Sequence, residues 1–369
     1  MFKLARIKLL LAIIFLVILG LSRPVLAAPE AAPGLDIYSK AVVTSVTSSS
    51  ANNAINFDEN TVQPAIIEVK IISGAEKGRQ VKAQYEEGIA GKLQVGDKVV
   101  INNPNSQGNY YVVDPYRLNY LLFFILLFFA VAIYFGHKRG IYSILGLVIS
   151  VLIIFYYLIP QIIAGGRPLI VSLIAALLIS VISLFVAHGF SKRTTIAFVS
   201  TIISLAIAVF TDLVMVYVSK LTGTSSEEAL YLRFGNSPVD FQGILLGGIL
   251  IGVLGILDDI TTAQTAAVEE IHQANQTLSF ADLYRRGLSV GREHIVSLIN
   301  TLVLAYVGVF LPMILLLVSS KGGSLWVVMN SGLMAEEIVR TLVGSLVLVI
   351  AVPLTTFLAA YYYSKKNNL

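Results

Sequence analysis

The sequence predicts an all-α membrane bundle of about seven transmembrane helices, preceded by a small extracytoplasmic β-barrel-like domain. The first observation is composition: 56% of the 369 residues are hydrophobic and 13% are charged, against about 25% charged in soluble proteins. The second is that a polar, strand-like stretch is followed by seven long apolar runs. The third is that basic residues cluster beside those runs, which indicates membrane orientation rather than nucleic-acid binding, despite the net charge of +4.

Residues 1–27 have the layout of a secretory signal peptide. Three basic residues precede an apolar run from Leu9 to Leu21, and Val25 and Ala27 fit the small-residue positions of a cleavage site. A retained N-terminal anchor is the alternative. The chain has no cysteine, which excludes disulfides, zinc-thiolate sites, cysteine nucleophiles and a lipoprotein anchor.

Residues 35–117 are predicted to form the extracytoplasmic domain, an OB-like or SH3-like barrel. Gly96 is expected to supply a positive φ in a tight turn before a strand. Tyr85, Tyr110 and Tyr111 are either core residues or a stacking surface for a ligand. The five β-rich runs are Ala41 to Thr47, Ala65 to Ile72, Gln80 to Tyr85, Lys98 to Asn102 and Tyr110 to Val113.

Residues 118–361 contain the membrane domain, and residues 362–369 form a cytoplasmic tail. Each predicted span reaches the roughly 17 to 25 apolar residues that cross a bilayer. The spans are Leu118 to Phe135, Ile141 to Ile159, Pro168 to Ala187, Thr194 to Val218, Phe241 to Leu257, Ile295 to Val318 and Ile338 to Tyr361.

The charges of the connections orient these spans. With the outer domain outside, nine Lys or Arg residues lie in cytoplasmic segments and four lie outside, which fits the positive-inside rule and favours seven spans. The inner set is Lys138, Arg139, Lys192, Arg193, Arg285, Arg286, Arg292, Lys365 and Lys366, and the outer set is Arg167, Lys220, Arg233 and Lys321. We therefore predict a multi-pass protein of the bacterial plasma membrane with a cytoplasmic C-terminus.

The fifth span carries the most informative motif, the adjacent acids Asp258 and Asp259. An ionised Asp at mid-bilayer costs about 2.5–3.5 kcal/mol on insertion scales, so a pair there needs a partner, a cavity or a function. The span either stops at Leu257, leaving the acids at the interface, or runs on to about Glu270 within the cytoplasmic connection 258–294. Before the acids, small residues allow close helix packing: they are Gly243, Gly247, Gly248, Gly252 and Gly255.

The acids are candidates for a proton or ion relay. On a helix that continues, Asp258, Thr262, Thr265 and Glu269 share one face, while Asp259 lies about 100° away. Further candidate members are His294, Asn300 and Thr301 of the next span and Asp212 of the fourth. For His294 and Asp212, interfacial anchoring or capping is the simpler interpretation.

Three local patterns complete the helical part. Ser279 and Asp282 form a capping-box pattern that starts a basic amphipathic segment suited to the inner leaflet. Glu336 and Arg340 are spaced to pair, and Pro353 is expected to kink the last span.

Together these features resemble the YibE/F-like family of bacterial polytopic membrane proteins. The similarity extends from about Tyr38 to Tyr361 and rests on Gly96 to Val99, Val113 to Arg117, Gly255 to Gln264 and Glu336 to Gly344. It implies the architecture and no settled activity.

A more distant similarity links residues Ile251 to Asp259 to the RND permeases and Sec export subunits. In those proteins a glycine-containing helix carries an Asp-Asp pair used for proton coupling. Here Gly255 stands three residues before Asp258, where the permease pattern usually has four, and the run after the pair is more polar.

We predict a transport-class protein, coupled to protons or another ion, whose partners are the lipid bilayer and a small-molecule or ion substrate. The alternative is a non-transporting scaffold whose outer domain recruits an envelope protein. A minor alternative is intramembrane proteolysis through Asp212 and Asp258. No phosphate-binding loop, His-Glu-x-x-His zinc site or nucleophile elbow is present, so we expect no cofactor, metal or nucleic-acid partner, and enzymatic activity is the less favoured interpretation.

Overall fold

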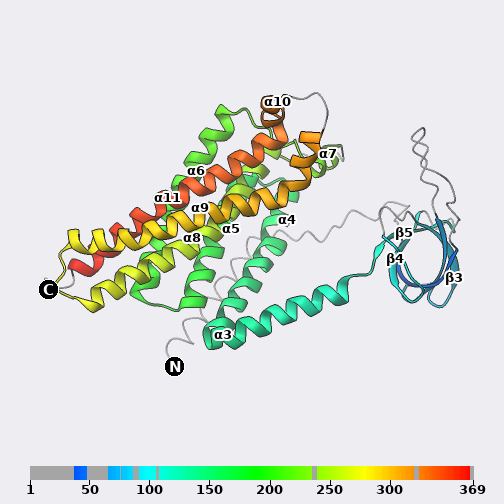
Figure 1. The fold of residues 1–369 in the computed structure, drawn as a ribbon, viewed down its shortest axis with the longest axis horizontal. Helices are drawn as coiled ribbons and strands as arrows, with labels where there is room; N and C mark the ends of the chain where they lie inside the picture. Colours follow the sequence, from blue (N-terminus) through cyan, green and yellow to red (C-terminus); the bar gives the residue numbers. More distant parts are fainter. Residues whose placement is uncertain are drawn as a thin grey trace. The chain divides into compact units, whose positions relative to one another are not determined.

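A computed structural model describes residues 37–47, 65–74, 76–85, 91–104, 108–234, 239–319 and 324–365. The predicted signal segment 1–27 and the last residues of the tail, 366–369, lie outside this part. The chain divides into two compact units, Leu26–Val131 and a second that comprises Met1–Val25 and Ala132–Leu369. The ribbon in Figure 1 shows the β-strands of the first and the helices of the second.

The first unit contains a closed five-stranded barrel in which the strand order is β1-β2-β3-β5-β4. All pairings are antiparallel except the short parallel pairing of β3 with β5. This closure confirms the prediction of a small barrel, and a non-sequential order of this kind fits an OB-like domain. The strands are β1 Ile37–Thr47, β2 Ala65–Ile71, β3 Gln80–Tyr85, β4 Lys98–Asn103 and β5 Tyr110–Pro115.

Alternation along the strands places one face of each in the barrel core. In β2, for example, Ile67, Val69 and Ile71 are buried while the residues between them are exposed, as a half-buried strand requires. Gly96 has the predicted positive φ, 99°. Its N–H donates to the Val43 carbonyl at 2.8 Å, so the turn is tied to β1.

The barrel tyrosines do not form one stacking surface. Tyr85 and Tyr110 are buried, and the Tyr110 hydroxyl donates to Glu76 at 2.7 Å. Burial, and the neighbouring Glu76 carboxylate, raise the pKa of Tyr110. Tyr111 points outward, and strand register places it in one row with Asn102 of β4 and Tyr38 of β1. The exposed aromatic pair is therefore Tyr38 and Tyr111.

The second unit is built of long helices. Six helical segments in the described residues are long and apolar enough to cross a membrane. The elements are α3 Leu118–Ile153, the π-helix η2 Ile154–Leu158, α4 Ile159–Ile163, α5 Pro168–His188, α6 Lys192–Val218, α7 Glu227–Phe234, α8 Phe241–Ala274, α9 Phe280–Ser319, α10 Leu325–Met329 and α11 Gly332–Lys365.

One of the six segments, Leu118–Ile163, holds the first two predicted spans. His137 interrupts it with non-helical dihedrals, φ 47° and ψ −132°. A Cβ on Gly140 would collide with the carbonyl oxygen of Ala132. In a straight helix those two residues would be about 12 Å apart along the axis, so the chain turns back at His137.

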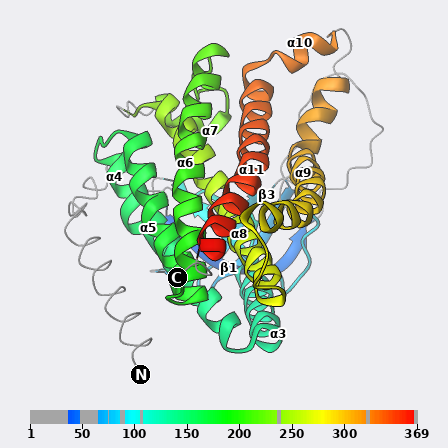
Figure 2. The ribbon, with the colours of Figure 1, turned by 90° about the vertical axis from the view of Figure 1, so that its left-hand side faces the viewer.

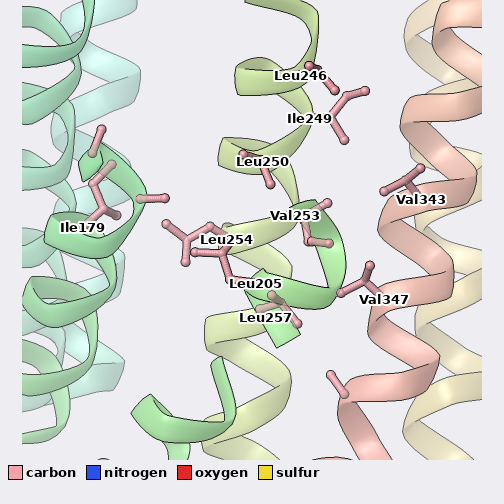
Figure 3. Close-up of a cluster of buried hydrophobic side chains, with 14 of the residues drawn as sticks. Ile179, Leu205, Leu246, Ile249, Leu250, Val253, Leu254, Leu257, Val343 and Val347 are labelled. Atoms are coloured by element: carbon pink, nitrogen blue, oxygen red, sulfur yellow. The ribbon is translucent and has the colours of Figure 1, made fainter. Parts of the chain in front are cut away.

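The helix α8 is the centre of the bundle. It packs against α5, α6, α9 and α11, and Figures 1 and 2 show these helices running alongside it. In Figure 3, α8 lies between the helix of Ile179 and the helix that carries Val343 and Val347. Its side chains Leu250 and Leu254 are fully or almost fully buried in this core. The helix α8 is therefore in contact with four other helices, and one narrow face, on which Gly248, Gly255 and Asp259 lie, is left exposed.

Three details of the helices bear on the sequence predictions. The helix α8 runs without a break to Ala274, so it does not stop at Leu257. The amphipathic segment and the sixth span form one helix, α9, which Ser279 caps by accepting the Asp282 N–H at 3.2 Å. Pro353 lies inside α11, which continues past it to Lys365.

The predicted pairing of Glu336 with Arg340 is wrong. Arg340 pairs instead with Glu337 at 2.8 Å, one turn away at i,i+3. Glu336 is buried and accepts hydrogen bonds from the Gly223 N–H at 3.1 Å and the Ser225 hydroxyl at 2.7 Å. Its carboxylate thus ties the loop before α7 to α11, and this demand for a partner outweighs the favourable i,i+4 spacing.

Candidate functional site

The first half of α8 approaches α5 through two glycines. A Cβ on Gly247 would collide with the Ser172 side chain, and one on Gly243 would lie 3.1 Å from Pro168 Cδ. The remaining three are not packed in this way: a Cβ on Gly248 or Gly255 would have nothing within 4 Å, and one on Gly252 would meet only the Tyr306 hydroxyl at 3.9 Å. Among the five glycines of α8, only Gly243 and Gly247 therefore allow a close approach to α5.

The two adjacent acids face different surroundings. Asp258 is 7% exposed, and Ser180 and Ser183 of α5 lie beside its carboxyl group. Its Oδ1 atom is buried and has no hydrogen-bond partner among the described residues. Asp259 is exposed and lies within electrostatic range of His188 at the end of α5. The helical rotation of about 100° per residue separates the pair, as expected.

Beyond Asp258, a polar stripe continues along the buried face of α8. Thr261 shares a 2.8 Å hydrogen bond with Thr201 of α6, and Thr265 donates to the Thr261 carbonyl at 2.7 Å. The predicted stripe ran through Thr262 instead, which is only half buried. Its hydroxyl donates to the backbone carbonyls of Asp258 and Asp259, at 2.8 and 3.0 Å. The buried face is thus rotated from the predicted one toward α6.

Gln264 joins three helices at this level. Its Nε2 group donates to the Gly287 carbonyl of α9 and to the Thr356 hydroxyl of α11, both at 2.8 Å. A Cβ on Gly291 would lie 3.0 Å from the Gln264 amide and would collide with Val352. The absence of a side chain at Gly291 therefore makes room for the Gln264 side chain.

The candidate relay members on α9 lie on its outer faces. Asn300 and Thr301 are exposed, and the Thr301 hydroxyl donates to the Ser297 carbonyl of its own helix at 2.9 Å. His294 is half buried, and its Nδ1 atom has no partner among the described residues. No hydrogen bond or ion pair in the described part of the chain joins these three residues to Asp258.

Asp212 of α6 is fully buried, and neither carboxyl oxygen has a hydrogen-bond partner among the described residues. Arg340 of α11 is its nearby opposite charge. Helices α6 and α8 run antiparallel with Thr201 opposite Thr261. Asp212 lies eleven residues after Thr201 on α6, a distance of about 16 Å along the helix axis. Asp258 lies three residues before Thr261 on α8, about 4.5 Å along the axis, and because the helices are antiparallel this displacement is in the same direction.

The two buried acids are consequently about 12 Å apart along the bundle. Two carboxyl groups that share one catalytic water or proton lie about 3 Å apart. This separation argues against intramembrane proteolysis by Asp212 and Asp258.

The sequence patterns do not point to several residues of the helix contacts. They are the half-buried Ser183 and buried Ser180 of α5, the buried Thr201 and Ser204 of α6, the buried glycines Gly287 and Gly291 of α9, and the buried Thr356 of α11. The usable signal was spacing, because each pair recurs at three or four residues and so marks one helix face. Such a face can pack against another helix in a membrane.

In the part of the chain that the structure describes, no three or more His, Asp or Glu side chains are grouped so as to hold a metal ion. The polar side chains beside the Asp258 carboxyl group are the hydroxyls of Ser180 and Ser183, which can hydrogen-bond to a proton-carrying acid or to a polar group of a substrate.

Comparison with protein families gives a match over the helical unit. The profile described as YibE/F-like protein matches residues 124–365. The chain belongs to this family. The part of the chain that matches includes α5 to α11, and so both Asp258 and Gln264. The barrel strands precede the matched residues. No curated protein and no solved structure matches the chain.

Proposed function

We propose that the protein is an integral membrane protein with seven spans. Six apolar helical segments support this, and the reversal at His137 divides the longest one into two. A straight helix of its 46 residues would be about 69 Å long, more than twice the 30 Å hydrocarbon core.

The orientation that we propose places the outer barrel outside and the C-terminus in the cytoplasm. Charged and aromatic residues from three helices gather at one end of the bundle: Arg193 of α6 pairs with Glu269 of α8 at 3.8 Å, and Lys192 lies over the Tyr362 ring of α11 at 5.7 Å. By the positive-inside rule, this basic end is cytoplasmic.

We further propose a transport-class function in which Asp258 binds and releases the coupling proton. The observation that carries this proposal is a buried carboxyl group on α8, with hydroxyls of α5 beside it and one oxygen unpartnered among the described residues. A buried carboxylate without a cationic partner is costly, and a structural role would be expected to satisfy both oxygens. Its place on the central helix would couple its charge to the packing of four neighbours.

Carbodiimide labelling tests the proton site without a known substrate. Dicyclohexylcarbodiimide reacts with protonated carboxyl groups in apolar surroundings. In protein reconstituted into liposomes, we expect peptide mass spectrometry to find the adduct at Asp258 and its yield to fall as the pH rises. Asp259→Asn is the matched control and should label as the wild type does, because Asp259 is exposed.

Transport is tested by the internal pH of the same liposomes, followed with an enclosed dye while candidate solute gradients are imposed. Asp258→Asn should abolish every solute-driven pH change and Asp259→Asn should retain it. Equal activity of the wild type and Asp258→Asn would remove the proposed mechanism.

A scaffold function is the second candidate, and the exposed row of Tyr38 and Tyr111 on the barrel favours it. These side chains are 59% and 40% exposed. A photo-crosslinker at Tyr111 should capture an envelope protein, while one at buried Tyr110 should not. If the double variant Tyr38→Ala/Tyr111→Ala keeps every cellular phenotype of the wild type, this face recruits no required partner.

A further inference from the structure

A cavity at the basic end of the bundle is not used by either function above. It has a volume of about 680 Å³ and lies between the first turns of α6 and the last turns of α11. Its lining divides by chemistry. Ile196, Val199 and Leu358 form an apolar wall, whereas the side chains toward the helix ends are Ser191, Lys192, Thr195, Tyr361 and Tyr362.

Lys192 is the cation of this cavity, and it differs from the next residue along the chain. Arg193 is paired with Glu269 at 3.8 Å. Lys192 is exposed and forms no ion pair within the described residues, and its ammonium group lies 5.7 Å from the centre of the Tyr362 ring. An aromatic face stabilises a cation without neutralising it, so the positive charge of Lys192 remains available to a ligand.

The tyrosines indicate the depth of the cavity. Tyr361 and Tyr362 lie at the end of α11, next to Lys365, whose ammonium group contacts the Tyr361 ring at 5.5 Å. Tyrosines and basic residues at the end of an apolar helix are typical of the membrane–water interface. In the proposed orientation this is the cytoplasmic leaflet, which carries anionic lipids.

We propose that this cavity binds one acidic phospholipid. The lipid phosphate contacts the Lys192 ammonium group, and an acyl chain lies along Val199 and Leu358. Charge complementarity selects an acidic headgroup over a zwitterionic one, and the apolar wall selects a lipid over a free anion. The proposal rests on the membrane orientation given above but not on the proton site at Asp258.

Lipid retention during purification tests the proposal. Full-length protein in detergent is incubated with equal amounts of phosphatidylglycerol and phosphatidylcholine, and bound lipid is counted by native mass spectrometry. The wild type should prefer phosphatidylglycerol. Lys192→Gln should lower that preference about fivefold, the factor that one basic residue near an anionic surface contributes, and Lys192→Arg should retain it.

Two further variants locate the effect. Arg285→Gln removes a basic side chain of α9 that lies outside the cavity and is 79% exposed, so its lipid preference should equal that of the wild type. Val199→Trp fills the apolar wall and should lower retention of both lipids. Circular dichroism melting curves confirm that each variant is folded before its lipid is counted.

Three results would overturn the proposal: equal retention of the two lipids by the wild type, equal losses in Lys192→Gln and Arg285→Gln, or displacement of the lipid by inorganic phosphate alone. A Lys192→Gln protein that loses its lipid preference while Asp258 still reacts with carbodiimide separates this site from the proton site.

Discussion

The two halves of α8 pack by opposite means. From Phe241 to Leu257 the helix presents glycines and branched apolar side chains, and contact with α5 depends on how closely the backbones approach. From Asp258 to Ala274 most of the buried side chains are polar, and contact includes hydrogen bonds to α6, α9 and α11. Because lipid tails are as apolar as leucine, helices in a bilayer associate through tight packing or polar contacts, and this one helix uses each in turn.

The largest effect should come from breaking the close approach. Gly247→Leu places a side chain where the Ser172 side chain lies, and overpacking of this kind costs up to about 3 kcal/mol of unfolding free energy. Thermal unfolding in detergent, followed by circular dichroism, measures the loss.

Gly248→Leu is the control for that variant, since a Cβ at Gly248 has nothing within 4 Å. It should change stability by less than about 0.5 kcal/mol. Equal losses in both variants would mean that the close approach to α5 does not hold the first half of α8 in place.

The next effect should come from the polar half. Gln264→Leu removes the donor to the Gly287 carbonyl and the Thr356 hydroxyl, and a buried acceptor left without a partner costs about 1–3 kcal/mol. Gln273→Leu changes an exposed residue of the same helix and should be close to neutral in the same melting experiment. If the two variants unfold at the same temperature, the hydrogen bonds of Gln264 do not hold the three helices together.

Asp258→Asn should move stability in the other direction. Replacing a buried acid whose Oδ1 atom lacks a partner by a neutral amide removes the cost of a buried charge, and should raise the free energy of unfolding by about 1 kcal/mol, within the range of common stabilising substitutions. Asp259→Asn should leave it unchanged. A loss of stability in Asp258→Asn would place Asp258 with Gln264 as a structural residue, and would count against the proton site.

The smallest effect concerns the hydroxyl pair of Thr201 and Thr261. Hydrogen bonds between membrane helices average about 0.6 kcal/mol in double-mutant cycles, and we expect this coupling between Thr201→Val and Thr261→Val. Thr262→Val provides the control, because its hydroxyl bonds to carbonyls of its own helix. Coupling of Thr201 with Thr262 should be zero within error.

The sequence predicted the elements of the fold well because their signals are local. Alternation and turn residues fall within a few positions of one another, and all five barrel strands lie where they were expected. Apolar run length likewise located the long helices. The sequence leaves the end of α8 open between two alternatives, because Thr261, Thr262 and Gln264 suit a helix interior as well as a solvated end.

Partners within the site were harder to predict because they are distant in the chain. Gln264 lies 23 residues from Gly287 and 92 from Thr356, and nothing in the neighbouring residues specifies either contact. In the sequence, Gly287 and Gly291 lie close to Arg285, Arg286 and Arg292, and this pattern predicts a basic amphipathic helix at the membrane surface. The wrong pairing of Glu336 has the same origin, since its true partners lie more than 100 residues earlier.

The central position of α8 has a consequence for synthesis. Helices α5 and α6 leave the ribosome before α8, yet Thr201 finds its partner Thr261 only 60 residues later. Until then, the hydroxyls of Ser180, Thr201 and Ser204, all fully buried in the finished bundle, have no α8 to face. For a bundle that spans the membrane, as we propose, we expect the nascent chain to be kept beside the insertion machinery, or in loose association, until α8 enters. A chain cut short before α8 would carry this polar face into the lipid and would be a substrate for membrane quality control.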